Sequence, residues 1–489
     1  MNGEQIKNAL QLVKKNDTDL RHVRVSQVQH DTRKVTENTC FVCIVGAVVD
    51  GHQLADEAVA KGATLIVAEK ELSVAVPVLY VNDTQKALAQ LSVLATGNPS
   101  SKLGMVGVTG TNGKTTITHV VASILDDNNR SSGIIGTMYS KIGDRQIPVA
   151  NTTPDSLTTQ QLLADMVADG LTHCTMEASS HALIQGRVRG IDFDVAVFTN
   201  LTQDHLEYHH TMEEYFLAKS LLFSQLGNAY GEQGKQKLAV INIDDAYGER
   251  LIPLTAANVL TYGCQGRGDI QAQNVVVTNH GTSFDLLFLG EIYPVTMKMI
   301  GDFNVYNILA AFGACYGLGL ASEAIIRSIA KIEGVKGRFQ LVPNHRGVTA
   351  IVDYAHTPDG LENVLKTINK FAEGAVYCVV GCGGDRDPSK RPVMADVAMT
   401  YATHPVFTSD NPRTEDPTEI IKQMTRHLSG NKYVEIVERR EAIEYALSKA
   451  EKHDVVLIAG KGHEDYQIIG TTKHHFDDVE IVNDYFAKH

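Results

Sequence analysis

The feature that most constrains this chain is a glycine-rich turn between a buried β-run and an amphipathic helical run. Its sequence, VGVTGTNGKTTITHVVASIL, begins at Val106 and places Gly113 and Lys114 where the helix starts. Backbone N–H groups at a helix N-terminus bind phosphate oxygens, and a lysine there adds positive charge at the β- and γ-phosphates. The generic phosphate-binding loop has glycine where this chain has Val108. We interpret the segment as a variant of that loop, against the alternative of a chance glycine-rich turn.

Short β-rich runs alternate with helical runs along the whole chain, which favours parallel sheets with crossover helices. Clusters of turn residues at 96–104 and 334–342 indicate boundaries. With 489 residues, and about 150 residues to a typical domain, we predict an α/β protein of three domains: residues 1–98, 99–336 and 337–489. The runs interpreted as buried strands begin at Thr64, Leu103, Asp194, Ala350, Tyr377 and Asp454.

Composition excludes several classes of protein. Hydrophobic residues make up 43% of the chain and charged residues 21%, which is ordinary for a globular protein and excludes intrinsic disorder. The net charge of −13 disfavours a nucleic-acid binder. No apolar signal segment opens the chain, and the apolar stretch 308–321 is shorter than the ~18 residues of a membrane span. We therefore expect a cytoplasmic protein with neither membrane nor nucleic acid as a partner.

Two short motifs invite a functional interpretation that we reject. Cys40 and Cys43 form a CxxC pair, but the string CFVC is apolar and no second pair completes a zinc site, so we predict structural burial. The string GCGGDRD, from Gly381, follows a strand as a dinucleotide-binding loop would. Arg386 occupies the position of that motif's last glycine, which argues against a dinucleotide cofactor.

The string TGTNGKTT resembles the Mur ligases, ATP-dependent enzymes that build the peptide of bacterial cell-wall precursors. The resemblance implies a small N-terminal α/β domain that binds UDP, a central P-loop ATPase-like parallel-sheet domain, and a C-terminal Rossmann-like domain. Further matching strings follow in the family's order: MEASSHAL, NLTQDHLEYH, YFLAKSLLF, GDFNVYN, GRF, DYAHTPD, GCGGDRD, SDNPRTEDP and AGKGHEDYQ, which together span residues 176–467.

The resemblance implies an ATP site between the second and third domains. Lys114 would act in catalysis, Asn304 and Asn307 would contact adenine, Arg338 a phosphate and Asp353 the ribose. The full set of residues implied to bind ATP is Thr109, Gly110, Thr111, Asn112, Gly113, Lys114, Thr115, Thr116, Asn304, Asn307, Arg338, Asp353 and His356.

Magnesium is the cofactor that the resemblance implies, with Thr115, Glu177 and His205 as ligands. Lys219 resembles the lysine that these enzymes carry as a carbamate (N6-carboxylysine), which turns a cation into a metal-binding anion. Without the family, Lys219 would be interpreted as an ordinary helix-surface lysine. His209 and His210, next to His205 in sequence, are expected to be surface or packing residues and not zinc ligands.

A second set of residues would bind the substrate that accepts the new amino acid, UDP-N-acetylmuramoyl-L-Ala-D-Glu. The first-domain part of the match, HDTRKV and VGAVVDGH, is the weakest, and a structural role for Thr32 or His52 stays open. The set is Thr32, His52, Asn151, Thr152, Thr153, Ser179 and Arg187.

The third-domain strings resemble the branch of the family that adds meso-2,6-diaminopimelate. Diaminopimelate has a distal carboxylate that lysine lacks, and a guanidinium can pair with it through two hydrogen bonds. The resemblance gives this role to Arg413. It implies that Arg386 also binds a carboxylate and that Glu464 pairs with an ammonium group. The alternative for Arg413 is an exposed turn arginine. The implied set is Arg386, Asp410, Asn411, Pro412, Arg413, Gly460 and Glu464.

We therefore expect a monomeric ATP-dependent ligase that forms an acyl phosphate on the D-glutamate carboxylate before diaminopimelate attacks it. Two rival classes remain. A relative that adds lysine, D-Ala-D-Ala or polyglutamate would share the ATP machinery, and a non-enzymatic P-loop switch would carry GTPase-type base-recognition strings, which we do not find.

Overall fold

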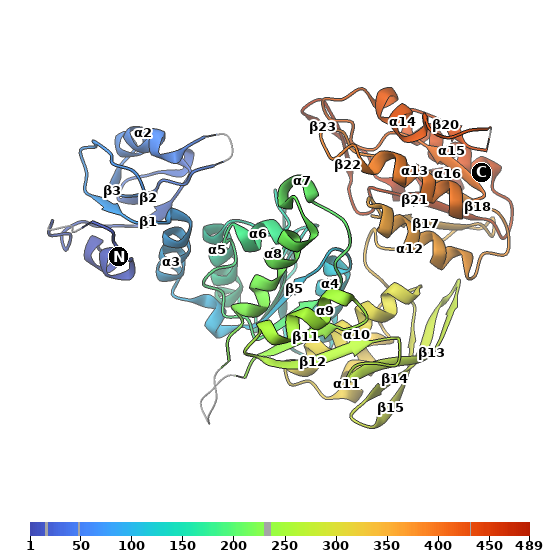
Figure 1. Cartoon of the computed structure of the whole chain (residues 1–489), viewed down its shortest axis with the longest axis horizontal. Coiled ribbons are helices and arrows are strands. Elements are labelled where there is room, and N and C mark those ends of the chain that lie inside the picture. Colours follow the sequence, from blue (N-terminus) through green and yellow to red (C-terminus); the bar gives the residue numbers. More distant parts are fainter. Residues whose placement is uncertain (15–17, 47–48, 229–235, 431) are drawn as a thin grey trace.

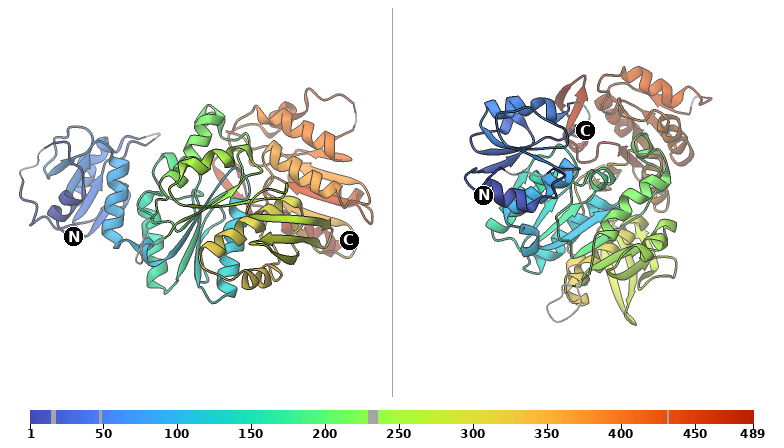
Figure 2. Two further views of the ribbon diagram at one scale, coloured as in Figure 1. Left: turned by 60° about the horizontal axis from the view of Figure 1, so that its bottom comes forward. Right: turned by 60° about the vertical axis from the view of Figure 1, so that its left-hand side comes forward.

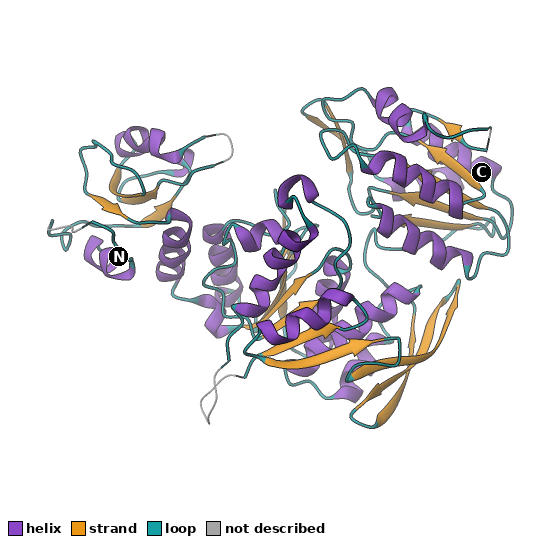
Figure 3. Cartoon of the chain, viewed as in Figure 1, coloured by secondary structure: helices purple, strands orange, loops and turns teal. Residues whose placement is uncertain are grey.

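Figure 1 shows a computed structural model of the chain, which describes residues 1–14, 18–46, 49–228, 236–430 and 432–489. Over these ranges the strands form sheets of four, eleven and six strands and one two-stranded ribbon. Each of the three larger sheets has helices packed against it (Figure 3). The four-stranded sheet lies at one end of the molecule, the eleven-stranded sheet at its centre and the six-stranded sheet at the other end (Figure 1; Figure 2, left).

The first sheet is parallel throughout, with its strands in sequence order. Cys40 and Cys43 lie on and just after its second strand; both are fully buried, and burial raises the pKa of each thiol to about 12. Their predicted structural role is confirmed. The elements of this unit are α1 (Gly3–Ala9), β1 (Gln27–Gln29), η1 (Thr32–Lys34), β2 (Thr39–Val42), η2 (Gly51–Leu54), α2 (Ala55–Ala60), β3 (Ala63–Ala68), β4 (Val78–Tyr80) and α3 (Thr84–Thr96).

The central sheet has a parallel middle and antiparallel margins, in the order β15-β14-β13-β12-β11-β10-β5-β9-β6-β7-β8. Successive side chains of a strand point to opposite faces of the sheet. Val106 and Val108 of β5 therefore pack with α4 and α10 on one face, and Met105 packs with α5 and α8 on the other. Its strands are β5 (Gly104–Thr109), β6 (Ser132–Ile135), β7 (Ser140–Ile142), β8 (Arg145–Ile147), β9 (His173–Glu177), β10 (Val195–Phe198), β11 (Leu238–Asn242), β12 (Asn258–Gly263), β13 (Ile270–Thr278), β14 (Gly281–Phe288) and β15 (Glu291–Met297).

Helices connect most of the parallel strands of this unit, as the alternating sequence pattern predicts, whereas no helix of the described residues lies between β6, β7 and β8 or between β12, β13, β14 and β15. The helices are η3 (Pro99–Lys102), α4 (Lys114–Asp127), α5 (Ser156–Ala168), α6 (Ser180–Ile184), α7 (Leu206–His209), α8 (Met212–Ser224), α9 (Ala246–Leu251), η4 (Ile252–Leu254), α10 (Asp302–Gly317) and α11 (Ser322–Ile329).

The third sheet has the order β16-β17-β21-β18-β19-β20 and is parallel except at β16. Helices α12, α13 and α14 cover one face, and α15 and α16 cover the other. The elements are β16 (Gln340–Val342), β17 (Thr349–Asp353), α12 (Pro358–Asn369), β18 (Val376–Val380), α13 (Lys390–Tyr401), β19 (His404–Phe407), α14 (Pro417–Thr425), β20 (Val434–Glu435), α15 (Arg439–Lys449), β21 (Val455–Ala459), β22 (Tyr466–Ile469), β23 (Thr472–His475) and α16 (Asp478–Lys488).

The fold confirms the predicted α/β class, and each predicted strand is present, as β3, β5, β10, β17, β18 and β21. No helix in the described ranges is long and apolar enough to span a membrane. In an open parallel sheet, ligands bind where the strands end. The phosphate loop follows β5, Glu177 ends β9, Asp353 ends β17, and Gly460 follows β21, so the predicted site residues collect at the carboxyl ends of two sheets.

A fully buried ion pair fixes two of these strand ends in the third unit. Arg439 makes a bidentate pair with Asp478, at 2.9 and 2.7 Å, and also donates to the carbonyls of Ser409 and Ala459. Those carbonyls directly precede Asp410 and Gly460, so the pair positions the loops that carry them.

Replacing Asp478 by alanine is expected to cost about 3–5 kcal/mol of stability, because Arg439 would be left as a buried charge without its partner. Calorimetric melting of the variant measures the loss. The matched control is Asp484→Ala on the same helix, where the carboxylate is exposed and lies 4.0 Å from Arg440; its melting should barely change. Equal melting of the two variants would contradict the assignment.

Candidate active site between the central and third sheets

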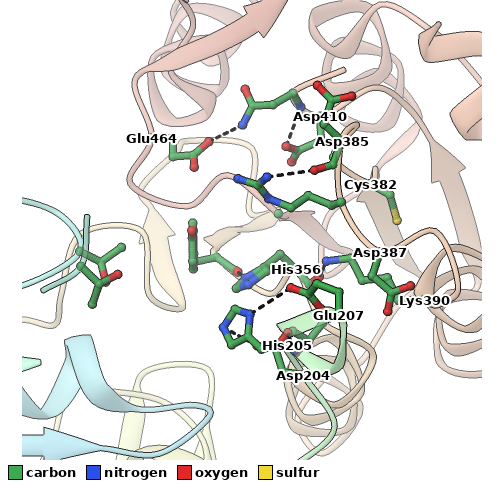
Figure 4. Close-up of a pocket in the computed structure, with 18 of the residues that line it drawn as sticks. Asp204, His205, Glu207, His356, Cys382, Asp385, Asp387, Lys390, Asp410 and Glu464 are labelled. Carbon is green, nitrogen blue, oxygen red and sulfur yellow. Dashed lines mark hydrogen bonds and ion pairs between the residues drawn. The ribbon is translucent and has the colours of Figure 1, made fainter. Parts of the chain in front are cut away.

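Two neighbouring cavities open where the central and third sheets face each other. The larger has a volume of about 1140 Å³ and the smaller about 360 Å³. Both are lined by Tyr354, His356 and Thr357, which follow β17. Figure 4 shows the larger cavity, with Asp204, His205 and Glu207 on one wall and Asp385, Asp410 and Glu464 on the other. We call them the nucleotide cavity (the smaller) and the acceptor cavity (the larger).

The phosphate loop reaches the nucleotide cavity through Asn112, Gly113 and Thr116. Gly113 caps α4 with φ +89, and a Cβ there would lie 2.6 Å from Asn307 Oδ1, so only glycine fits. Lys114 folds back over the loop, and its Nζ donates to the carbonyls of Gly110 (2.9 Å) and Thr111 (2.8 Å). Burial lowers the pKa of Lys114. The loop thus has the geometry expected of a phosphate site.

Glu177 lies buried beside the start of α4. Its carboxylate accepts hydrogen bonds from the Thr115 hydroxyl, 3.0 Å from each oxygen, and from the backbone N–H and hydroxyl of Thr137 (2.8 and 3.0 Å). Arg338, from the third unit, donates to the same Thr115 hydroxyl at 2.9 Å. Magnesium prefers oxygen ligands and keeps several waters. A hydroxyl and a carboxylate side by side at a phosphate loop therefore fit that ion.

The other predicted magnesium ligands lie further along the central unit. His205 precedes α7, lines the acceptor cavity, and has ring nitrogens 3.4 Å from Asp204 and 3.6 Å from Glu207. Within the part of the chain that the structure describes, no three His, Cys, Asp or Glu side chains form a ready-made metal cluster. Glu177 and His205 are therefore not joined in one, and their metal roles stay predictions.

Lys219 is not a surface residue. It is 1% exposed on α8, its Nζ donates to the carbonyl of Gly110 at 2.8 Å, and it lies over the Tyr215 ring at 4.4 Å. Burial, followed by the positive charge of Lys114, lowers the pKa of Lys219 well below its usual value. The lysine is thus held next to the phosphate loop in a setting that favours its neutral amine. His209 packs as predicted, buried and stacked on Tyr215.

The two asparagines predicted to contact adenine, Asn304 and Asn307, have different surroundings. Asn307 lines the nucleotide cavity, whereas Asn304 does not. Asn304 is buried, donates to the carbonyl of Ile300, and accepts from Asn307 at 3.0 Å. Asn304 therefore holds the side chain of Asn307 in place, and its own predicted contact with adenine stays a prediction.

The third unit contributes the remaining predicted ATP residues. Arg338, Asp353 and His356 all line the nucleotide cavity. Asp353 is buried and accepts from the backbone N–H groups of Phe339 (2.6 Å) and Ala355 (2.8 Å), while burial raises its pKa. Burial lowers the pKa of His356 to about 4, so its ring is neutral at pH 7. Residues of both the central and the third unit line the nucleotide cavity, as expected if a nucleotide binds between them.

Most residues predicted to hold the muramoyl dipeptide line the acceptor cavity, namely Asn151, Thr152, Ser179 and Arg187. Thr153 does not: it is fully buried, and its hydroxyl donates to the carbonyl of Glu177 at 2.7 Å and accepts from the N–H of Ser179 at 3.1 Å. Thr153 therefore links the two loops, and its predicted contact with the substrate stays a prediction.

The predicted amino-acid site forms the opposite wall of the acceptor cavity. Arg386 and Arg413 lie near each other, and burial, followed by the charge of Arg386, lowers the pKa of Arg413. Glu464 accepts from Asn411 (2.9 Å) and from the buried Lys461 (3.0 Å). Two adjacent guanidiniums beside a carboxylate match a ligand that carries both a carboxylate and an ammonium.

Other residues of this wall act through the backbone. Gly460 has φ +115, and a Cβ there would lie 2.7 Å from Asp410 Oδ2, so the loop needs glycine to come this close. Pro412 does not line the cavity. It lies in the turn that presents Arg413, which itself has φ +51, and its predicted contact with the amino acid stays a prediction.

The first unit supports the structural alternative for its two predicted residues. Both ring nitrogens of His52 are engaged, Nδ1 with Asp50 at 2.6 Å and Nε2 as acceptor from the N–H of Glu69 at 3.0 Å. His52 is buried, so it has no free polar atom for uridine diphosphate. Thr32 is buried as well. Residues 47–48 of the string VGAVVDGH lie outside the described residues.

Several residues of the site escaped the sequence analysis. Asp359 lines the acceptor cavity and accepts from the phosphate-loop side chain Asn112 at 2.8 Å. Lys390 lines it too, and its Nζ donates to the carbonyl of His356 (Figure 4). Lys461 is fully buried beneath Glu464. Asp359 and Lys461 lie within the family strings DYAHTPD and AGKGHEDYQ, and Lys390 lies three residues after GCGGDRD, so these strings are the signal that could have indicated them.

Fold and site together define a nucleotide-dependent ligase. Family models match in three places: "Mur ligase family, catalytic domain" over residues 24–95, "Mur ligase middle domain" over 108–315, and "Mur ligase, glutamate ligase domain" over 337–462. The chain belongs to the Mur ligase family.

Individual relatives cover nearly the whole chain. The UDP-N-acetylmuramoyl-L-alanyl-D-glutamate–2,6-diaminopimelate ligase of Lactiplantibacillus plantarum is 53% identical over 98% of this chain and 97% of its own. The enzyme of the same name from Listeria monocytogenes is 52% identical over 93% of each chain. A solved structure of a ligase with this name is 34% identical, has a TM-score of 0.73, and covers 100% of this chain and 99% of its own.

Proposed function

We propose that this chain is an ATP-dependent ligase that joins meso-2,6-diaminopimelate to UDP-N-acetylmuramoyl-L-alanyl-D-glutamate in peptidoglycan precursor synthesis. The observation that carries the proposal is the pair of cavities with a shared wall. The phosphate loop opens into one, and the paired arginines Arg386 and Arg413 line the other. The relatives that share about half of its sequence carry the name of this reaction.

The reaction that this arrangement supports begins on the D-glutamate carboxylate. Arg187, on the central wall of the acceptor cavity, would hold the dipeptide so that its carboxylate faces the γ-phosphate of ATP. The carboxylate oxygen attacks that phosphorus, ADP leaves, and an acyl phosphate forms. Lys114 lies at the loop where negative charge accumulates and stabilises it electrostatically.

The second half of the reaction uses the opposite wall. Arg386, Arg413 and Glu464 would orient diaminopimelate so that its free amine attacks the acyl carbon. The tetrahedral intermediate then collapses to the amide, and phosphate leaves. Since the two walls belong to different units, closure of the third unit brings the amine to the activated carboxyl.

We also propose magnesium as the cofactor. Thr115 would hold one ion together with the ATP phosphates, and Glu177, His205 and a carbamate on Lys219 would hold a second. When bound, the metal neutralises charge on the phosphates. The domain boundaries proposed are 1–98, 99–336 and 337–489, and the protein is proposed to act as a cytoplasmic monomer.

The carbamate has its own chemical support. A neutral amine adds CO₂ and releases a proton, and burial of Lys219 favours the neutral amine. The carbamate nitrogen keeps one N–H, which could still donate to the carbonyl of Gly110. We expect Lys219→Ala to lose activity by about 10³-fold and to recover part of it when acetate or formate is added. Intact-mass spectrometry of the native protein should show one added CO₂.

Two results would contradict the carbamate. One is the absence of rescue by any short carboxylate, together with an unmodified mass. The other is equal rescue of Lys237→Ala, a control at a buried lysine that pairs with Asp192 and Asp194 away from both cavities.

The test of the proposed function is phosphate release with ATP and the muramoyl dipeptide, with diaminopimelate or lysine as the second substrate. We expect release that depends on the dipeptide and on diaminopimelate, with ADP as the other product. Release with lysine alone would overturn the substrate assignment. Turnover without either amino acid would favour a plain ATPase or a switch, and AMP as product would refute the acyl phosphate.

A further inference from the structure

One end of the nucleotide cavity holds a buried carboxylate whose two oxygens have unequal surroundings. Asp244 follows β11, lines this cavity, and has a side chain only 4% exposed. Its Oδ2 accepts three hydrogen bonds, from the backbone N–H groups of Cys264 (2.6 Å) and Gln265 (3.1 Å) and from the Tyr306 hydroxyl (2.8 Å). This oxygen has no capacity left for a ligand.

The other oxygen, Oδ1, is buried without a hydrogen-bond partner in the described part of the chain. Arg267 lies 4.0 Å from it, too far for a hydrogen bond, and directs its own N–H groups to Glu249 and to the carbonyl of Ile243. A buried polar atom left unpaired destabilises the folded protein, because it has lost its hydrogen bonds to water. Since Asp244 lines the cavity, a bound ligand could supply the missing donor.

The surroundings of Asp244 fit the base of a nucleotide. Tyr262, Phe303 and Tyr306 line the same cavity and offer ring surfaces, while Asn307 offers an amide. The phosphate loop enters the same cavity at Gly113, and Asp353 lines it from the third unit. A purine bound among these rings would present its edge groups to the polar side chains of the wall.

An ionised carboxylate accepts hydrogen bonds and cannot donate them. At the 6-position, adenine has an amino group, which donates, whereas guanine and hypoxanthine have a carbonyl oxygen, which would face the carboxylate with no hydrogen between them. We propose that Asp244 Oδ1 accepts a hydrogen bond from the 6-amino group of adenine and sets the preference for ATP over 6-oxopurine nucleotides. This inference rests on the proposed use of a nucleotide.

The wild-type protein gives the first test, by calorimetric binding of ATP and of purine riboside 5′-triphosphate, which lacks only the 6-amino group. ATP should bind about 10- to 100-fold more tightly, since a hydrogen bond to a charged group is lost in the analogue. Inosine triphosphate should bind at least as weakly as that analogue. Equal binding of ATP and purine riboside triphosphate would overturn the proposal.

Asp244→Asn gives the sharper test. The three donors around Oδ2 require an acceptor, so the amide oxygen must take that position. The amide NH₂ then takes the position of Oδ1, where it offers a donor to the base. We expect ATP to bind more weakly and inosine triphosphate more tightly, so that the ratio of the two affinities falls by about 100-fold or reverses. An unchanged ratio would overturn the proposal.

Tyr306→Phe is the matched control. It removes one donor to Oδ2 and leaves Oδ1 as an acceptor, so both nucleotides should weaken together and their ratio should stay as in the wild type. A ratio that changes as in Asp244→Asn would overturn the specific role of Oδ1.

The proposed function fails in a different way. A wild-type protein that binds ATP but releases no phosphate with diaminopimelate loses the proposed reaction and keeps the role of Asp244. A wild-type protein that binds no nucleotide overturns both.

Discussion

Lys114→Ala is expected to lose ATP turnover by about 10³-fold, the scale seen when one preorganised donor to a developing charge is removed. Lys114 is the first residue of α4, and its Nζ is held by the carbonyls of Gly110 and Thr111 within the phosphate loop. The negative charge that collects there during transfer would lose this cation. Phosphate release at saturating ATP, dipeptide and diaminopimelate measures the loss.

The matched control is Lys331→Ala, at an exposed lysine that pairs with Asp127 on the surface. It removes the same side chain and should leave turnover near the wild-type rate. Melting of both variants shows whether they are folded. If Lys114→Ala is folded and keeps more than about a tenth of the activity, the phosphate loop does not act as proposed, since that loss is only about 1.4 kcal/mol.

The parts of the site that could be predicted are those written in short stretches of sequence. The phosphate loop is an example, because the run of glycines, Lys114 and the following helix are all local. The order of strands and helices put the loop, Glu177 and Asp353 at strand ends, which is where parallel sheets bind ligands.

What could not be predicted depends on rotation and on contacts between distant segments. Asn304 and Asn307 are both plausible contacts by sequence, and only the packing of α10 decides that Asn307 faces the cavity. Thr152 and Thr153 differ in the same way. Asp244 escaped notice because the three donors that occupy its Oδ2 come from the loop after β12 and from α10, which lie far from it in sequence.

The contact between Asn112 and Asp359 joins residues 247 positions apart. No local pattern in the sequence contains it. It ties the phosphate loop to the start of α12, and so places the wall of the acceptor cavity relative to the nucleotide. The proposed specificity for diaminopimelate depends on that wall, and Arg413 is the residue where it can be tested most directly.

Arg413→Ala is expected to raise the KM for diaminopimelate on the order of 10²- to 10³-fold, as for loss of one partner of a buried charge pair. The structure favours an anion at this place: the pKa of Arg413 is lowered first by burial and then by the neighbouring charge of Arg386, and a bound carboxylate would relieve both effects. The KM for ATP should stay near the wild-type value, because Arg413 does not line the nucleotide cavity.

Arg413→Lys separates charge from geometry. It keeps the positive charge but loses the planar fork that pairs with a carboxylate at two points, so its KM for diaminopimelate should fall between those of the wild type and Arg413→Ala. In Arg413→Ala the preference for diaminopimelate over lysine should fall by about the same factor as the KM for diaminopimelate rises, since no guanidinium binds the distal carboxylate. Equal losses in the use of ATP and of diaminopimelate would instead give Arg413 a structural role, through its hydrogen bond to the carbonyl of Gly384 at 2.7 Å.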